Sequence, residues 1–297
     1  MSVEVVARKQ LRTIADLLRW AIAELEKPLG LAEARSSAER LLEEVSGFER
    51  AGLYLEADRS IPVPQIKQFK NWVLKRKARI PVAYLTEKAY FWNEELFVSR
   101  DCLIPRAETE ILVEKFIEKS SFDKKARFSL LDLACGSGAI GISLLREFPN
   151  AHAVFADISA KALKITLRNL KKYQLTKRSK LICSNVFSKI KQRSKFDAIV
   201  CNPPYLGDSD FSNLQKEVEN EPHVALSGGR DGLDLYREVI KSAPDYLKDG
   251  APLFFEMGRG QSKKIAAMFK KSEAFTNIFI FKDYAKIDRV ILARKKL

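Results

Sequence analysis

The sequence predicts an α/β domain built on a parallel sheet, preceded by a small helical domain. From residue 129 onward, apolar segments of strand length alternate with segments of helical period. Before residue 82, apolar residues recur at helical spacing. The length of 297 residues allows one large or two ordinary domains, and the 46% hydrophobic content is enough for a sizeable core.

The N-terminal part predicts three amphipathic helices. Residues 3–26 and 32–46 each place their apolar side chains on one helical face, and Lys27-Pro28-Leu29-Gly30 separates them. A third helix is expected over residues 65–77. We assign residues 1–82 to the helical domain.

The segment 83–104 predicts a β-hairpin between the domains. Aromatic residues, including Phe91 and Trp92, surround the polar turn Asn93-Glu94-Glu95. A helix running through Phe116 then follows, with acidic residues in its first turn.

The remaining chain predicts the sheet and its helices. Expected strands are residues 130–134, 153–156, 180–183, 198–201, 252–257, 276–281 and 289–293. Expected helices are residues 139–148, 160–173, 235–247 and 261–271. The last two strands follow each other without a helix, so we expect an antiparallel partner at the sheet edge.

The motif Asn202-Pro203-Pro204-Tyr205 directly follows the apolar run 196–201. An apolar β-branched run that stops at two prolines is typical of a buried strand ending in a rigid loop, since proline has no N–H for the sheet. We expect the Asn202 carboxamide oxygen and the Pro203 carbonyl to converge and grip a planar NH2 group by both hydrogens. Tyr205 can then cover the flat face of that group.

Such a grip suits an amide or aromatic amine, whose nitrogen is a poor nucleophile because its lone pair is delocalised. Acceptors on both hydrogens orient the nitrogen and stabilise the positive charge that develops as it attacks an electrophile, without a strong base. The tetrapeptide alone is equally compatible with an ordinary turn, since proline and asparagine are turn formers. A methyl donor site in the same chain would favour the catalytic interpretation.

A glycine-rich segment follows the first expected strand of the sheet. Gly136, Gly138 and Gly141 satisfy the pattern G-x-G-x-x-G at the start of a helix. Asp157 ends the next strand, where a carboxylate can bind two ribose hydroxyls, and Asn185 ends the third, within reach of an adenine edge. These features fit NAD and S-adenosylmethionine equally, because both contain adenosine. The neutral clamp favours methyl transfer, since a nicotinamide enzyme needs an acid or base beside its hydride acceptor.

Composition narrows the class of protein further. The net charge of +14 favours an anionic partner such as nucleic acid, the ribosome or an acidic protein, with an ordinary solvated surface as the alternative. The four cysteines form no CxxC pair and there are two histidines, so no zinc site is expected. Reduced cysteines in or beside strands indicate a cytosolic protein. We expect neither a signal peptide nor a membrane span.

With these motifs in place, the chain resembles the glutamine methyltransferases that modify peptide chain release factors, the PrmC or HemK family, over nearly its whole length. The matching segments are residues 79–84, 91–92, 104–106 with Thr109 and Glu110, 132–138, 157–159, 202–205, 221–222 with 225–226, and 229–233.

The resemblance implies a fold and an activity. It implies a helical substrate-recognition domain over residues 1–82, a β-hairpin linker over 83–104, and a Rossmann-like, seven-stranded S-adenosylmethionine-dependent methyltransferase domain over 105–297. The expected reaction methylates the side-chain amide of the glutamine in the Gly-Gly-Gln motif of release factors. We expect a cytoplasmic monomer with no membrane partner; direct nucleic-acid binding is less expected but stays open.

The resemblance also implies which residues form the site. Cofactor-binding residues would be Ala134, Cys135, Gly136, Ser137, Gly138, Asp157, Asn185, Val186 and Asn202. Substrate-binding residues would be Asn202, Pro203, Pro204, Tyr205, Phe91 and Arg106. Of these, Asn202, Pro203 and Tyr205 would be catalytic, and no metal ion is expected.

The sequence departs from the family pattern at three places. Ala134-Cys135 stands where Gly-Thr is usual, Asn185 where Asp is frequent, and Ala107-Glu108 where Pro-Asp is frequent. None removes a needed group, because the loop contacts are mostly backbone and Asn still hydrogen-bonds adenine. Three alternatives stay open: a ribosomal-protein glutamine methyltransferase, an adenine amino-group methyltransferase for RNA or DNA, and a non-catalytic ribosome- or RNA-binding module.

Overall fold

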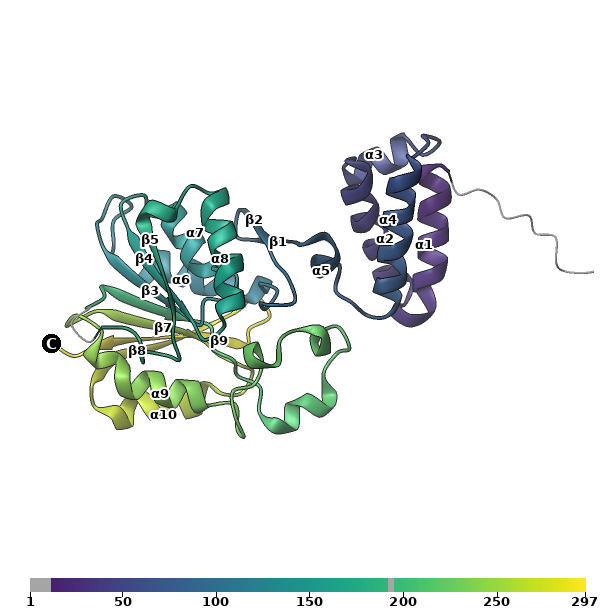
Figure 1. The fold of residues 1–297 in the computed structure, drawn as a ribbon. Helices are drawn as coiled ribbons and strands as arrows, with labels where there is room; N and C mark the ends of the chain where they lie inside the picture. Colours follow the sequence, from purple (N-terminus) through teal and green to yellow (C-terminus); the bar gives the residue numbers. More distant parts are fainter. Residues whose placement is uncertain (1–11, 192–194) are drawn as a thin grey trace, which may run out of the picture. The chain divides into compact units, whose positions relative to one another are not determined.

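The computed structural model describes residues 12–191 and 195–297, and the chain divides into two compact units between Glu87 and Lys88. The first unit is helical and the second contains the sheet (Figure 1).

Helices form the first unit throughout its described part. They are α1 (Ile14–Leu29), α2 (Leu31–Ser46), α3 (Arg50–Leu55), α4 (Val63–Lys77) and α5 (Val82–Thr86). Thr13 caps α1 by accepting a hydrogen bond from the Asp16 N–H. The predicted break over residues 27–30 is shorter than expected: α1 continues through Pro28 to Leu29, and Gly30 alone separates it from α2. The expected helix over residues 3–26 lies outside the described residues before residue 12. The short helices α3 and α5 were not predicted.

The predicted β-hairpin begins the second unit. Strands β1 (Lys88–Phe91) and β2 (Glu94–Phe97) pair antiparallel, with Phe91 opposite Glu94. The hairpin is tied to a helix of its own unit: the buried Asn169 side chain accepts from the Phe97 N–H at 2.7 Å and donates to the Phe97 carbonyl at 3.0 Å. The hairpin is therefore fixed to the sheet domain.

The sheet of the second unit has seven strands in the order β5-β4-β3-β6-β7-β9-β8. Their bounds are β3 (Ser129–Leu133), β4 (His152–Asp157), β5 (Ser179–Cys183), β6 (Ala198–Cys201), β7 (Pro252–Glu256), β8 (Phe275–Lys282) and β9 (Asp288–Lys295). All pairs from β5 to β7 are parallel. The predicted parallel sheet is confirmed.

The predicted antiparallel partner lies at the sheet edge, where β8 pairs antiparallel with β9. Strand β9 lies between β7 and β8 and is antiparallel to both. Residues 290–293 of β9 are all buried, whereas β8 is mostly exposed. This difference follows from their positions in the sheet, because neighbouring elements cover both faces of an inner strand.

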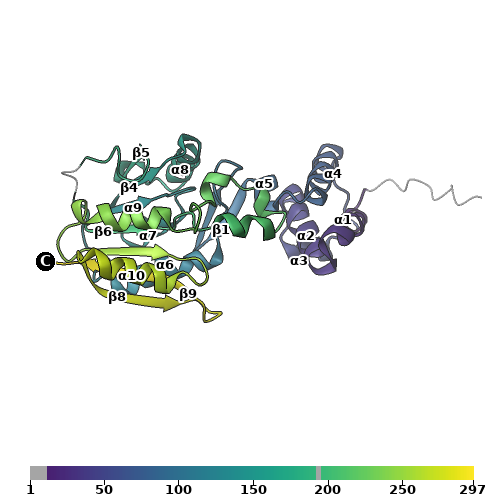
Figure 2. The same cartoon turned by 90° about the horizontal axis from the view of Figure 1, so that it is seen from below.

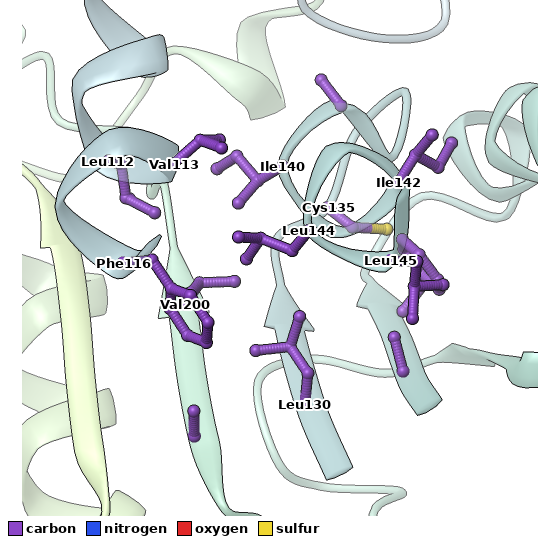
Figure 3. Packing of buried hydrophobic residues seen from close by; sticks show 14 of the residues in the cluster. Leu112, Val113, Phe116, Leu130, Cys135, Ile140, Ile142, Leu144, Leu145 and Val200 are labelled. Carbon is purple, nitrogen blue, oxygen red and sulfur yellow. The ribbon is translucent and has the colours of Figure 1, made fainter. Parts of the chain in front are cut away.

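Helices cover both faces of this sheet. Helices α6 (Glu110–Lys119), α7 (Ala139–Glu147) and α8 (Ala160–Lys172) pack on one face, and α9 (Asp234–Ser242) and α10 (Ser262–Ser272) on the other (Figures 1 and 2). Figure 3 shows Leu112 and Phe116 of α6 and Ile140 and Leu144 of α7 gathered over Val200 and Leu130 of the sheet.

The predicted helix 235–247 is shorter than expected. It ends at Ser242, and Pro244 lies in the short 3-10 helix that follows, because proline cannot continue the hydrogen-bond pattern of an α-helix. Further 3-10 turns occupy Asp208–Asn213, Val218–Asn220 and His223–Ala225, which belong to the long connection between β6 and α9.

Candidate functional site

The candidate site lies where the strand order of the sheet reverses. Strands β3 and β6 are neighbours, yet the chain after β3 enters α7 on one face and the chain after β6 leads to α9 on the other. Such a switch point opens a crevice at the carboxyl ends of the strands, where α/β proteins bind ligands. A cavity of about 230 Å³ occupies this position.

The cavity collects side chains and backbone from the ends of four strands. It is lined by Ala134 and Gly136 after β3, Asp157 at the end of β4, Asn185 and Val186 after β5, and Asn202 and Pro204 after β6. Leu103, Cys102, Ile158, Val224 and Leu235 contribute apolar surface. The structure therefore brings residues of the predicted cofactor loop and of the predicted clamp to one cavity.

The loop after β3 presents backbone to the cavity. Gly136 has φ 57°, and a Cβ placed there would meet no atom within 4 Å, so its left-handed conformation explains the glycine and the space beside it is open. Two buried side chains of α8 hold this loop: Thr166 Oγ1 donates to the Gly136 carbonyl at 2.8 Å, and Asn169 Nδ2 donates to the Ser137 carbonyl at 2.9 Å.

The predicted loop residues do not all face the cavity. The Cys135 side chain points into the protein, where its sulfur lies 3.8 Å from Thr166 Oγ1. Burial raises the pKa of its thiol well above the usual value, so the thiol stays protonated. Ser137 and Gly138 are buried beside it. Any contact of these residues with a ligand is made by backbone.

Asp157 organises the loops on both sides of its strand. Its Oδ2 accepts from the Gly136 N–H and its Oδ1 from the Ser159 N–H, each at 2.8 Å. Burial raises the pKa of this carboxyl, and the two backbone hydrogen bonds oppose the rise. Each carboxylate oxygen keeps a further lone pair with which it can accept from a ligand hydroxyl.

Asp132 lies beneath the same loop, near the start of α7. It is fully buried; its Oδ2 accepts from the Gly141 N–H at 2.9 Å, and its Oδ1 has no hydrogen-bond partner among the described residues. Burial raises the pKa of this carboxyl to about 7. An unpaired buried oxygen and an open glycine backbone fit a ligand that brings polar groups and positive charge.

The clamp residues lie after β6 as predicted, in a backbone held from two sides. Gln261 Nε2 donates to the Tyr205 carbonyl at 2.9 Å. Gly232, at φ 74°, passes so close that a Cβ there would lie 2.3 Å from the same oxygen. Pro203 is buried and Tyr205 half-buried, and burial raises the pKa of Tyr205 to about 12. Tyr205 therefore remains a neutral phenol at neutral pH.

The two other predicted substrate contacts differ in position. Arg106 forms an ion pair with the buried Glu221, which also accepts from the Ile104 N–H at 3.1 Å. Phe91 is 1% exposed and packs in the core with Leu96. Its side chain has no surface to offer a partner, since strand side chains alternate and the neighbouring Tyr90 is the exposed one, at 68%.

Sequence reasoning missed several side chains that position the site. Asn169 and Gln261 are described above, and Glu256 ends β7 with a side chain that is fully buried. Thr109 was named only as part of a matching segment; its hydroxyl accepts from Asn202 Nδ2 at 3.1 Å. Glu256 is a charged residue inside the apolar run 252–257, which is the signal in the sequence that could have indicated its buried contact.

Comparison with known proteins agrees with this geometry. The model of the methyltransferase small domain matches residues 107–230, and that of the PrmC N-terminal domain matches residues 16–86. A solved 16S rRNA methyltransferase of T. thermophilus, in complex with AdoMet and guanosine, has the same fold with a TM-score of 0.51 and 18% identity. The match covers 70% of this chain and 50% of the rRNA methyltransferase chain.

Curated relatives match over nearly the full length. The release factor glutamine methyltransferase of Geobacter sulfurreducens is 33% identical over 288 residues, which is 97% of this chain and 98% of the relative. That of Buchnera aphidicola subsp. Schizaphis graminum is 37% identical, over 93% of this chain and 98% of the relative.

Fold, cavity and family models together define a methyltransferase that uses S-adenosylmethionine. Within this class, the chain belongs to the release factor glutamine methyltransferase family. No helix in the described part of the chain is long and apolar enough to cross a membrane.

Asp132 predicts a pH-dependent stability. Its pKa of about 7 in the folded state exceeds the unfolded value, so the folded protein binds more protons between about pH 4 and 7, and stability falls as pH rises through that window. Asp132→Asn removes this titration. As the pH rises from about 5 to about 8, the unfolding free energy of the variant minus that of wild type should increase by on the order of 2 kcal/mol. Urea denaturation without cofactor measures both values.

The exposed Asp208→Asn serves as a control for the loss of one surface carboxylate. If the stability difference between Asp132→Asn and wild type did not change with pH, burial would not be raising the pKa of the Asp132 carboxyl.

Proposed function

We propose that this enzyme methylates the side-chain amide nitrogen of the glutamine in the Gly-Gly-Gln motif of peptide chain release factors. The observation that carries the proposal is that one cavity is lined by Asn202 and Pro204 of the predicted clamp and by Gly136 and Asp157 of the expected cofactor site. Pro203 and Tyr205 flank these clamp residues in the chain but are not among the residues that line the cavity. A methyl donor and a planar amide would then meet at the carboxyl ends of β3 and β6. The names of the relatives support release factors as the substrate class.

S-adenosylmethionine, when bound, supplies a methyl group on a positively charged sulfur. The residues that would hold it are Ala134, Gly136, Asp157, Asn185 and Val186, which line the cavity, with Cys135, Ser137 and Gly138 contributing backbone. Asp157 would accept from the ribose hydroxyls, and Asn185 would contact the adenine edge. Their roles are part of the proposal.

The clamp residues orient the substrate nitrogen. Asn202 Oδ1 and the Pro203 carbonyl would accept its two hydrogens, and Tyr205 would cover the amide plane. This arrangement stabilises the positive charge that develops on the nitrogen during attack. No group has to remove a proton before transfer, so the neutral Asn202, Pro203 and Tyr205 suffice.

Asn202→Ala removes the side-chain acceptor and tests this mechanism directly. Loss of one preorganised transition-state partner typically costs about 10²- to 10³-fold in turnover, with a much smaller effect on cofactor affinity. Asn202→Asp keeps an acceptor but adds a negative charge beside the sulfonium, so partial activity is expected. Single-turnover transfer to a release factor measures both variants. Transfer by Asn202→Ala at the wild-type rate would refute the clamp.

Asp157→Ala tests the ribose contact. Each charge-assisted hydrogen bond is worth about 1.5 to 3 kcal/mol, so affinity for S-adenosylmethionine should fall at least roughly tenfold in calorimetry. Because Asp157 also holds Gly136 and Ser159, the variant alone cannot separate the two effects. Wild type should therefore prefer adenosine to 2′-deoxyadenosine as a competitor, and the variant should lose that preference. An unchanged preference would show that Asp157 only holds the loops.

We further propose that the N-terminal helical unit recognises the protein substrate, with residues 1–82 as its domain and 83–104 as the linker to the catalytic domain 105–297. A chain of residues 88–297, cut at the observed boundary between the compact units, should bind S-adenosylmethionine normally. It should methylate full-length release factor much more slowly than the whole enzyme. Equal rates, with the truncated chain folded by circular dichroism, would contradict the recognition role.

An adenine amino group is the second candidate substrate, because it too is a planar NH2 and the net charge of +14 suits nucleic acid. Radiolabel transfer to release factors, ribosomal proteins and RNA, offered side by side, separates the candidates. We also propose that the enzyme is a cytoplasmic monomer. Gel filtration at assay concentration tests whether it is a monomer.

A further inference from the structure

Two hydrogen bonds connect Asn202 of the clamp, through Thr109, to Glu256 at the end of the neighbouring strand β7. Asn202 Nδ2 lies 3.1 Å from Thr109 Oγ1, and Thr109 Oγ1 lies 2.5 Å from Glu256 Oε2. The three residues come from the loop after β6, the 3-10 helix Ala107–Thr109 and the end of β7. Thr109 is 4% exposed and Glu256 is 1% exposed, so water does not compete for these bonds.

The chemistry of the three groups fixes which atom donates and which accepts in each of these two hydrogen bonds. An ionised carboxylate only accepts, so the single hydroxyl hydrogen of Thr109 must go to Glu256. The Thr109 oxygen can then only accept, which requires the NH2 end of the Asn202 carboxamide to face it. Oδ1 is then the end of the carboxamide that is left to accept from a substrate, and Asn202 is one of the residues that line the cavity.

We propose that Thr109 and Glu256 are positioning residues that hold the Asn202 carboxamide in the one orientation that presents Oδ1 to the substrate nitrogen. Without them, a rotation of about half a turn would present NH2 instead, and a donor cannot accept the hydrogens of a substrate amide. This inference rests on the proposed role of Asn202 in methyl transfer.

The surroundings of Glu256 make the orientation dependent on pH. Burial raises its pKa to about 7, and the hydrogen bond from Thr109 and the positive charge of Arg289 oppose the rise. Several charged or titratable groups interact electrostatically with Glu256. They are Arg106 and Glu108 before Thr109, Cys201 and Tyr205 at and after the end of β6, Tyr236 of α9 and Arg289 of β9. Tyr236 also donates to the Glu256 backbone carbonyl at 2.8 Å.

When Glu256 is protonated, the donor-to-acceptor direction of the two hydrogen bonds is no longer fixed. A carboxylic acid can donate to Thr109, which frees the Thr109 hydrogen to donate to Asn202 Oδ1. Both carboxamide orientations then become possible. Because the folded pKa is raised, the orienting carboxylate is present above about pH 7 and is lost as the pH falls through that value.

Thr109→Val, which keeps shape but removes the hydroxyl, is the test variant, and Thr109→Ser, which restores the hydroxyl, is its matched control. We expect the Val variant to lose about 10- to 100-fold in single-turnover methyl transfer to release factor, less than loss of the acceptor itself. Affinity for S-adenosylmethionine should stay within about twofold, as expected for an interaction made only in the transition state. The Ser variant should retain most of the activity, and Thr276→Val on the exposed β8 should match wild type.

The pH profile separates positioning from mere packing. Wild-type transfer should rise with pH through about 7, and Glu256→Gln, which keeps the shape without the charge, should lack this limb. A carboxyl 13C titration of Glu256 without cofactor gives a readout besides activity: its pKa should rise in Thr109→Val, because the bond from Thr109 lowers it.

Three results would overturn the inference while leaving the proposed function in place, provided that Asn202→Ala shows the loss of turnover expected above. The first is methyl transfer by Thr109→Val at the wild-type rate. The second is an equal loss of rate in Thr109→Val and Thr109→Ser. The third is a rate that still falls below about pH 7 in Glu256→Gln. If Asn202→Ala itself transfers at the wild-type rate, the proposed function fails instead.

Discussion

Adjacent parallel strands β3 and β6 send their following chains to opposite faces of the sheet, and the site depends on this divergence. A crevice opens because no helix can cover both strand ends at once. The glycine-rich loop then presents backbone groups from one side, and the Asn202 segment presents acceptors from the other. Strands β4 and β5 extend the same edge, which places Asp157 and Asn185 beside the cavity.

A crevice lined by loops needs support, and here buried polar side chains provide it. Asn169 ties the loop after β3 to the hairpin, and Gln261 ties the clamp to the chain before α9 through the Tyr205 and Gly232 carbonyls. Burying an amide is unfavourable unless its donors and acceptors are paired. Since these amides have several partners each, the bonds fix loop geometry that apolar packing alone would leave less defined.

Much of this fold could be predicted from the sequence, because strand and helix periods are local properties. The loop after β3, Asp157 and Asn202 could be placed at strand ends for the same reason. The pairing of Thr109 with Glu256 could not, since the two residues are 147 positions apart and a lone glutamate in an apolar run does not identify its partner. Likewise, the inner position of β9 and the burial of Phe91 depend on which surfaces meet in three dimensions.

The clamp and the carboxylate behind it divide their tasks in a way that suits amide chemistry. Burial raises the pKa of Tyr205 to about 12, so it is neutral at physiological pH, and Glu256 is hydrogen-bonded to Thr109 and is not among the residues that line the cavity. A carboxylate facing the sulfonium would stabilise the charged ground state more than the charge-dispersed transition state. In the proposed mechanism the charge of Glu256 would instead determine the direction of the hydrogen bonds through Thr109. The substrate nitrogen would then meet an uncharged acceptor, which would stabilise its developing charge without binding the donor cation more tightly than the reaction needs.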